Sequence, residues 1–141
     1  MPIEQHVDRA RGLVYTTITG IMTMQEIRRH VGVVRARHLM SMPELIDARG
    51  AIGGVATPRD LLRLAHFARE VLSCSPVAPR AVIVGNDESF GRARIFASFV
   101  AGWLRMAVFQ DEIAAREWLD NLTPAVDVPA STGPDALQAD F

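Results

Sequence analysis

A glycine-rich stretch near the middle of the chain holds the residues best placed for binding or chemistry. Asp47 closes a short apolar segment, and the loop after it leads to a helix start at Thr57 and Pro58. Glycine lets a loop take positive φ values or lie close to another group. In open α/β sheets, sites gather where strand carboxyl ends meet helix amino ends. We therefore predict a ligand or partner site at Asp47, Gly50, Gly53, Gly54 and Thr57.

Two of these residues have both an ordinary and a functional interpretation. Asp47 could be a catalytic carboxylate, but an aspartate at a strand end more often caps the backbone amides of its own loop. Thr57, followed by Pro58 and Asp60, has the pattern of a helix N-cap. Its hydroxyl could instead carry a phosphate at the positive end of the helix. No histidine or serine lies near Asp47 in the sequence to complete a nucleophilic triad.

No other pattern in the sequence commits the chain to a reaction. The segment 85–91 lies between a predicted strand and a helix, yet it lacks the lysine of a phosphate-binding loop, and we expect a turn capped by Asp87 or Ser89. The four histidines lack metal-ligand spacing, and the single cysteine, Cys74, excludes an internal disulfide. We predict no catalytic residue, no metal and no cofactor, so an enzyme ranks third among the possible functions.

Composition indicates one globular domain without a nucleic-acid function. The chain has 141 residues, of which 49% are hydrophobic and 22% are charged, and its formal net charge is −1. Proteins dedicated to nucleic acid usually carry a strong basic excess. The start of the chain lacks a signal-peptide pattern, and no apolar segment approaches the length of a membrane span. We therefore expect a cytoplasmic protein that binds no nucleic acid.

The elements that must position the site alternate between strand and helix. Residues 2–7 and 13–19 should form an antiparallel hairpin, followed by strands near 45–47, 80–85 and 105–109. Helices are predicted from Thr23 to about Leu39, over 58–72 and 89–103, and over 112–119. This order predicts an α/β domain over residues 1–120 with a mixed sheet of about five strands and about four helices. The composition of residues 121–141 predicts a proline-rich acidic tail.

Two predicted helices carry surface features that a core alone does not explain. The helix over 89–103 has a second apolar stripe formed by Ile95, Phe99 and Trp103. Self-association, an apolar ligand or the folded-back tail would each cover such a stripe. The first helix carries four arginines against one glutamate. That face is either simply solvated or docks an acidic protein, an anionic lipid head or nucleic acid.

Several segments resemble the short bacterial SpoIIAA-like proteins, which are related to the STAS domains of anti-sigma-factor antagonists. The resemblance rests on the strand at 45–47, the strand at 80–84 and the ending from Met106 to Leu119. It implies a non-enzymatic regulatory or protein-interaction module, and the apolar stripe around Phe99 predicts that this module is a homo-oligomer. It also makes Thr57 a candidate phosphosite, although the loop lacks the family's Asp-Ser-Ser/Thr-Gly run. The alternative is a binder of a small apolar or lipid-like ligand between helices, with Arg28, Arg59 or Arg63 at the head group.

Overall fold

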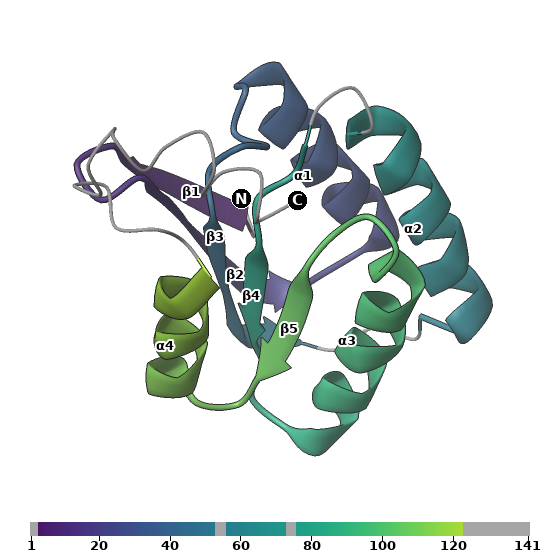
Figure 1. Cartoon of the computed structure of the whole chain (residues 1–141). Coiled ribbons are helices and arrows are strands. Elements are labelled where there is room, and N and C mark those ends of the chain that lie inside the picture. The colour runs from purple at the N-terminus through teal and green to yellow at the C-terminus, as the bar shows by residue number, and fades with distance from the viewer. Residues whose placement is uncertain (1–2, 53–55, 73–75, 123–141) are drawn as a thin grey trace.

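The computed structural model describes residues 3–52, 56–72 and 76–122, and its centre is a five-stranded mixed sheet (Figure 1). The strands lie in the order β1-β2-β3-β4-β5. β1 is antiparallel to β2, and each later strand is parallel to its neighbour. The bounds are β1 Ile3–Asp8, β2 Leu13–Ile21, β3 Glu44–Ile52, β4 Arg80–Ile83 and β5 Met106–Phe109. The predicted fold class, hairpin and parallel strands are confirmed.

Four helices cover the two faces of the sheet unequally. α1, α2 and α3 lie on one face, and α4 lies on the other (Figure 1). Their bounds are α1 Met24–Ala36, α2 Pro58–Leu72, α3 Asp87–Val100 and α4 Glu112–Leu122. None of the helices in the described part of the chain is both long and apolar enough to cross a bilayer. Residues 123–141, most of the predicted tail, lie outside the described residues.

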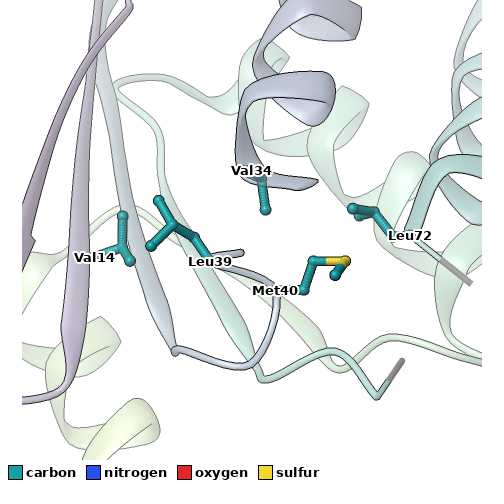
Figure 2. Packing of buried hydrophobic residues seen from close by; sticks show 5 residues of the cluster. All are labelled: Val14, Val34, Leu39, Met40 and Leu72. Atoms are coloured by element: carbon teal, nitrogen blue, oxygen red, sulfur yellow. The ribbon is translucent and has the colours of Figure 1, made fainter. Parts of the chain in front are cut away.

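Apolar side chains fill the space on both faces of the sheet. On the side of α1 and α2, a cluster joins the sheet to the helices through Val14, Val34, Leu39, Met40 and Leu72 (Figure 2). On the side of α4, the cluster consists of Leu45, Ala81, Ile83, Ala115 and Leu119. Leu45 of β3 and Ala81 and Ile83 of β4 therefore face α4, and Ala81 and Ile83 share one side of β4 because they are two positions apart.

Local sequence determines α2. Thr57 Oγ1 accepts the Asp60 amide at 3.2 Å, and Asp60 Oδ2 accepts the Thr57 amide at 3.0 Å. This reciprocal pair is the capping box that the sequence indicated. The helix occupies the predicted residues 58–72. It buries one apolar stripe, made of Leu61, Leu64, Ala65, Ala68 and Leu72.

The first helix ends three residues before the predicted Leu39. His38 has a positive φ of 57°. Its amide donates to the Arg35 carbonyl at 3.0 Å, and the Leu39 amide donates to the Val34 carbonyl at 2.9 Å. These two bonds form a Schellman motif, which closes the helix and turns Leu39 into the core beside Val34. The helix was predicted to reach Leu39 because this leucine continues the apolar pattern of the sequence. It does so because it is buried, but it lies beyond the end of the helix.

Replacing His38 by glycine is expected to stabilise the protein. A residue with a Cβ is strained in the left-handed region, where glycine is not. His38 is exposed, so its side chain contributes little packing. We expect His38→Gly to raise the free energy of unfolding by roughly 0.5 to 1 kcal/mol, measured by urea denaturation. Arg37→Gly, at a neighbouring position with a φ of −91°, should lower stability instead. A loss of stability in His38→Gly would contradict this account.

β3 is longer than predicted, which corrects the extent of the glycine-rich loop. Gly50 lies within the strand and pairs with Thr19, and the pairing continues to Ile52 opposite Ile21. The hydrogen-bond ladder with β2 therefore overrides the local preference of glycine for a loop. A Cβ on Gly50 would lie only 3.1 Å from Thr19 Cγ2, so the close packing of the two strands favours glycine there.

α3 differs from its prediction at both ends. Asn86, rather than Asp87 or Ser89, is the N-cap, because its side-chain oxygen accepts the Ser89 amide at 2.8 Å. The helix ends at Val100 instead of Trp103. Residues 101–103 form a turn in which the Trp103 amide donates to the Val100 carbonyl at 3.0 Å.

Candidate functional site

A small cleft opens between the sheet and the amino-terminal half of α4. Its volume is about 90 Å³, which corresponds to about three water molecules. β2, β3 and β4 supply its floor, and α4 supplies one wall. The lining residues are Tyr15, Thr16, Thr17, Leu45, Asp47, Ile83, Glu112 and Arg116. Of the predicted site residues, Asp47 lines this cleft.

Charged side chains at the cleft form one continuous chain of contacts. Asp47 accepts hydrogen bonds from Arg49 Nε at 2.9 Å and from its Nη2 at 2.8 Å. Arg49 also binds Glu112 at 2.8 Å, which links β3 to the first turn of α4. Glu112 accepts from Arg116 Nε at 2.8 Å, and Arg116 donates to the Tyr15 hydroxyl at 3.0 Å. The Arg116 guanidinium lies 5.1 Å from the centre of the Tyr15 ring.

These contacts keep both carboxylates of the cleft ionised. The Arg49 hydrogen bonds lower the pKa of Asp47, and burial opposes this shift. Hydrogen bonds from Arg116 and then Arg49 lower the pKa of Glu112. Asp47 Oδ1 also accepts the Arg49 amide at 3.1 Å, so this aspartate caps the backbone that follows it. A general acid at neutral pH needs a raised carboxyl pKa, and neither group has one. The arrangement is suited to polar recognition rather than proton transfer.

Three exposed isoleucines lie on the elements that carry this charged chain, and we call Ile21, Ile52 and Ile113 the isoleucine rim. Their exposed fractions are 69%, 60% and 67%. Pairing of β3 with β4 ends at Asp47 opposite Ile83, whereas β2 and β3 continue as a two-stranded extension to Ile21 opposite Ile52. Ile113 directly follows Glu112, which holds Arg49 of that extension. The rim residues therefore belong to β2, β3 and α4, the elements that also carry the paired charges.

The loop from β4 to α3 supports the extension from the other side. A Cβ on Gly85 would lie 3.2 Å from the Arg49 carbonyl oxygen. Glycine at position 85 thus allows the backbone of β3 to approach at Arg49. A turn was predicted over residues 85–91, but in the structure the turn is confined to Gly85 and Asn86, because α3 begins at Asp87.

The structure brings together only part of the predicted glycine-rich site. Asp47 and Gly50 lie in β3, three positions apart. Thr57 lies beyond the strand, is exposed and caps α2. Gly53 and Gly54 lie outside the described residues. Sequence reasoning missed Tyr15, Glu112 and Arg116, because their proximity to Asp47 depends on contacts far apart in the chain.

The predicted apolar stripe on α3 does not form one uniform surface. Phe99 is 37% exposed and Ile95 is half-buried. Trp103 lies past the helix end and packs against two buried core clusters. Phe99 is therefore the member of this stripe that is accessible to a partner.

A second polar cluster, which the sequence analysis did not identify, is buried under α1. Glu44 is 2% exposed and Arg80 is 4% exposed, and they begin the adjacent strands β3 and β4. Glu44 Oε2 accepts the Thr16 hydroxyl and lies 2.9 Å from His30 Nε2. Arg80 Nε lies 3.4 Å from Glu44 Oε1. The sequence does contain a signal for this cluster. Two predicted neighbouring parallel strands begin at Glu44 and Arg80, so their opposite charges lie side by side.

Arg80 also satisfies backbone groups that lie between elements. It donates to the carbonyls of Met42 at 2.7 Å, Ala78 at 2.9 Å and Leu39 at 3.1 Å. Burial lowers the pKa of Arg80, and the charge of Glu44 opposes this shift. Burial alone would raise the pKa of Glu44, but His30, Arg80 and Thr16 together lower it. This cluster joins α1 to the sheet and has a structural role.

The free energy of unfolding is expected to fall in acid because of Glu44. Its folded-state pKa lies below the ordinary value of 4.5. The stabilisation is therefore complete above pH 4.5 and is lost as the pH falls through the lowered folded-state value. Urea denaturation from pH 6 to pH 3 should show this loss, with a smaller pH dependence in Glu44→Gln. An equal pH dependence in both proteins would contradict the assignment.

The described residues contain no group of three or more histidine, cysteine, aspartate or glutamate side chains arranged to hold a metal ion. In the cleft, Asp47 and Glu112 are both already bound to Arg49. These two carboxylates therefore pair with a guanidinium group and are not arranged to bind a metal ion.

Comparison with known proteins relates this chain to others by fold. No protein-family model matches the sequence, and no curated protein matches it either. Among solved structures, it is similar to an uncharacterized protein of the DUF3478 family with a SpoIIAA-like fold from Shewanella loihica PV-4. The two share 17% sequence identity with a TM-score of 0.55, over 83% of this chain and 93% of the other. The SpoIIAA-like fold indicated by the sequence is thereby confirmed.

Proposed function

We propose that this chain is a non-enzymatic regulatory module that binds a protein partner through the isoleucine rim. The observation that carries the proposal is the high exposure of Ile21, Ile52 and Ile113 on the three elements that also carry a paired chain of charges. Protein interfaces combine such an apolar centre with polar groups at the edge. The proposed surface includes Asp47 and Gly50 of the predicted site.

The properties of the cleft favour this function over the alternatives. Its carboxylates have lowered pKa values, which is unfavourable for acid–base catalysis. A volume of about 90 Å³ is below the few hundred Å³ that a lipid-like ligand requires. A side chain of a protein partner could enter this cleft while the rim contacts its surroundings.

Charge substitutions on the rim test the proposal. The variant Ile21→Glu/Ile52→Glu should capture at least tenfold less of the partner from cells than the unmodified chain does, as measured by quantitative mass spectrometry. The matched control Val33→Glu/Leu62→Glu alters exposed apolar residues on α1 and α2, with exposed fractions of 37% and 41%. It should retain the same partner. The proposed surface would be contradicted if both variants lost the partner equally, or if neither variant reduced the amount of partner captured.

Self-association through α3 is a further part of the proposal, because Phe99 is an exposed aromatic residue on that helix. Sedimentation velocity of the full chain should show a dimer that Phe99→Glu dissociates and that the rim variant leaves intact. A monomer at all concentrations tested would remove self-association from the proposed function.

Thr57 is the proposed position of regulation by phosphorylation. Support comes from its exposure and from its place at the start of α2. A kinase-containing extract should modify the chain, and Thr57→Ala should abolish this modification. Modification that persists in Thr57→Ala would assign the phosphosite elsewhere.

A further inference from the structure

Arginine residues are concentrated on two adjacent helices. α1, its C-cap and α2 together carry seven exposed arginines, which are Arg28, Arg29, Arg35, Arg37, Arg59, Arg63 and Arg69. The same segments contain three acidic residues, Glu26, Asp60 and Glu70. The local excess is therefore +4, although the whole chain has a formal charge of −1. The folded chain is strongly polarised in charge.

Several of these arginines meet where the two helices pack together. α1 and α2 pack side by side on the sheet (Figure 1). The Arg28 guanidinium lies 5.6 Å from the centre of the Phe67 ring of α2, and Arg35 donates to the Val71 carbonyl at 3.2 Å. Hydrogen bonds with Thr57 lower the pKa of Asp60, and the charges of Arg63 and Arg28 add to this shift. Arginines of α1 and α2 therefore lie close to one another where the two helices meet.

These guanidinium groups form no salt bridge within the part of the chain that the structure describes. The ion pairs of the described residues involve Arg11, Arg49, Arg80, Arg92 and Arg116, together with His30. None involves an arginine of α1, its C-cap or α2. A surface held by internal salt bridges would instead pair these arginines, as α4 pairs Arg116 with Glu112.

We propose that the α1–α2 surface docks on an anionic lipid bilayer. Four or more arginines on one face are attracted to anionic lipid head groups, and guanidinium binds phosphate with directed hydrogen bonds. α4, which carries Ile113 of the isoleucine rim, lies on the opposite face of the sheet (Figure 1).

The observations favour a bilayer over other polyanions. Phe67 is the phenylalanine of this surface, which has no tyrosine or tryptophan on α1 or α2, and it is half-buried under Arg28, so no exposed phenyl, phenol or indole ring is available there for stacking on nucleic-acid bases. A small acidic protein segment would engage only some of seven arginines spread over two helices. A flat anionic surface can engage many of them at once.

Vesicle co-sedimentation of the full chain tests this proposal. We expect binding to vesicles of phosphatidylglycerol and phosphatidylcholine at low salt, but not to phosphatidylcholine alone. Each arginine at such a surface strengthens binding roughly fivefold, so Arg29→Gln/Arg59→Gln/Arg63→Gln should weaken it on the order of 100-fold. Raising the salt to several hundred millimolar should also release the protein.

A matched control separates a local surface from net charge. Arg9→Gln/Arg94→Gln/Arg105→Gln removes three exposed arginines that also lack ion pairs among the described residues, but lie outside α1 and α2. It changes the net charge equally and should retain binding within about twofold. Equal loss in both triple variants, or equal binding to neutral and anionic vesicles, would overturn the proposal. Binding to DNA or to an acidic protein without binding to vesicles would overturn it as well.

Discussion

Replacing Glu44 by glutamine is expected to lower the free energy of unfolding by about 3 to 5 kcal/mol. The substitution keeps the side-chain size but removes the charge that opposes Arg80, which is 4% exposed. It also weakens the contacts of the carboxylate with His30 and Thr16. Chemical denaturation monitored by tryptophan fluorescence would measure the loss. This large effect arises because one partner of a buried ion pair is left uncompensated.

Two further variants make this result interpretable. Glu4→Gln changes an exposed glutamate on β1 and should alter stability by no more than about 0.5 kcal/mol. A double-mutant cycle with Arg80→Met should show a coupling energy, because removing both charges is less costly than the sum of the single losses. A loss below about 1 kcal/mol in Glu44→Gln, or strictly additive losses in the cycle, would show that the pair is not a buried ionic interaction.

Truncation of Leu39 should have the second large effect. Leu39 is 1% exposed and packs with Val14, Val34 and Leu72 (Figure 2). We expect Leu39→Ala to lower the free energy of unfolding by roughly 2 to 5 kcal/mol, since it removes buried methyl groups and leaves a cavity. Leu62→Ala, at a residue that is 41% exposed on α2, should cost less than about 1 kcal/mol. Similar losses in the two variants would contradict the assigned core.

Sequence patterns predicted the elements whose signals are local. The bounds of α2 follow from Thr57, Pro58 and Asp60 at its start and from one apolar stripe along its length. The five strands were predicted from short apolar or β-branched runs between turn residues. The parallel arrangement followed from their alternation with helices.

The differences arise where distant contacts or backbone geometry decide the structure. Gly50 belongs to β3 because β2 pairs with it, which the residues around Gly50 do not indicate. His38 ends α1 in a conformation that is uncommon for histidine. The cleft likewise depends on Tyr15 and Arg116, which are 101 positions apart. Asp47 was predicted because the sequence pattern ended the strand there, whereas Glu112, which binds the same Arg49, required knowledge of where α4 lies.

Site-specific photo-crosslinking in cells tests most directly the claim that the isoleucine rim binds a protein. A photoreactive amino acid would be placed at position 52 and, in a separate control, at position 62, both of which carry exposed apolar residues. The proposal predicts one discrete crosslinked partner at position 52 that is absent at position 62 and is lost when Ile21→Glu is added. No adduct at position 52, or the same adducts at both positions, would contradict it.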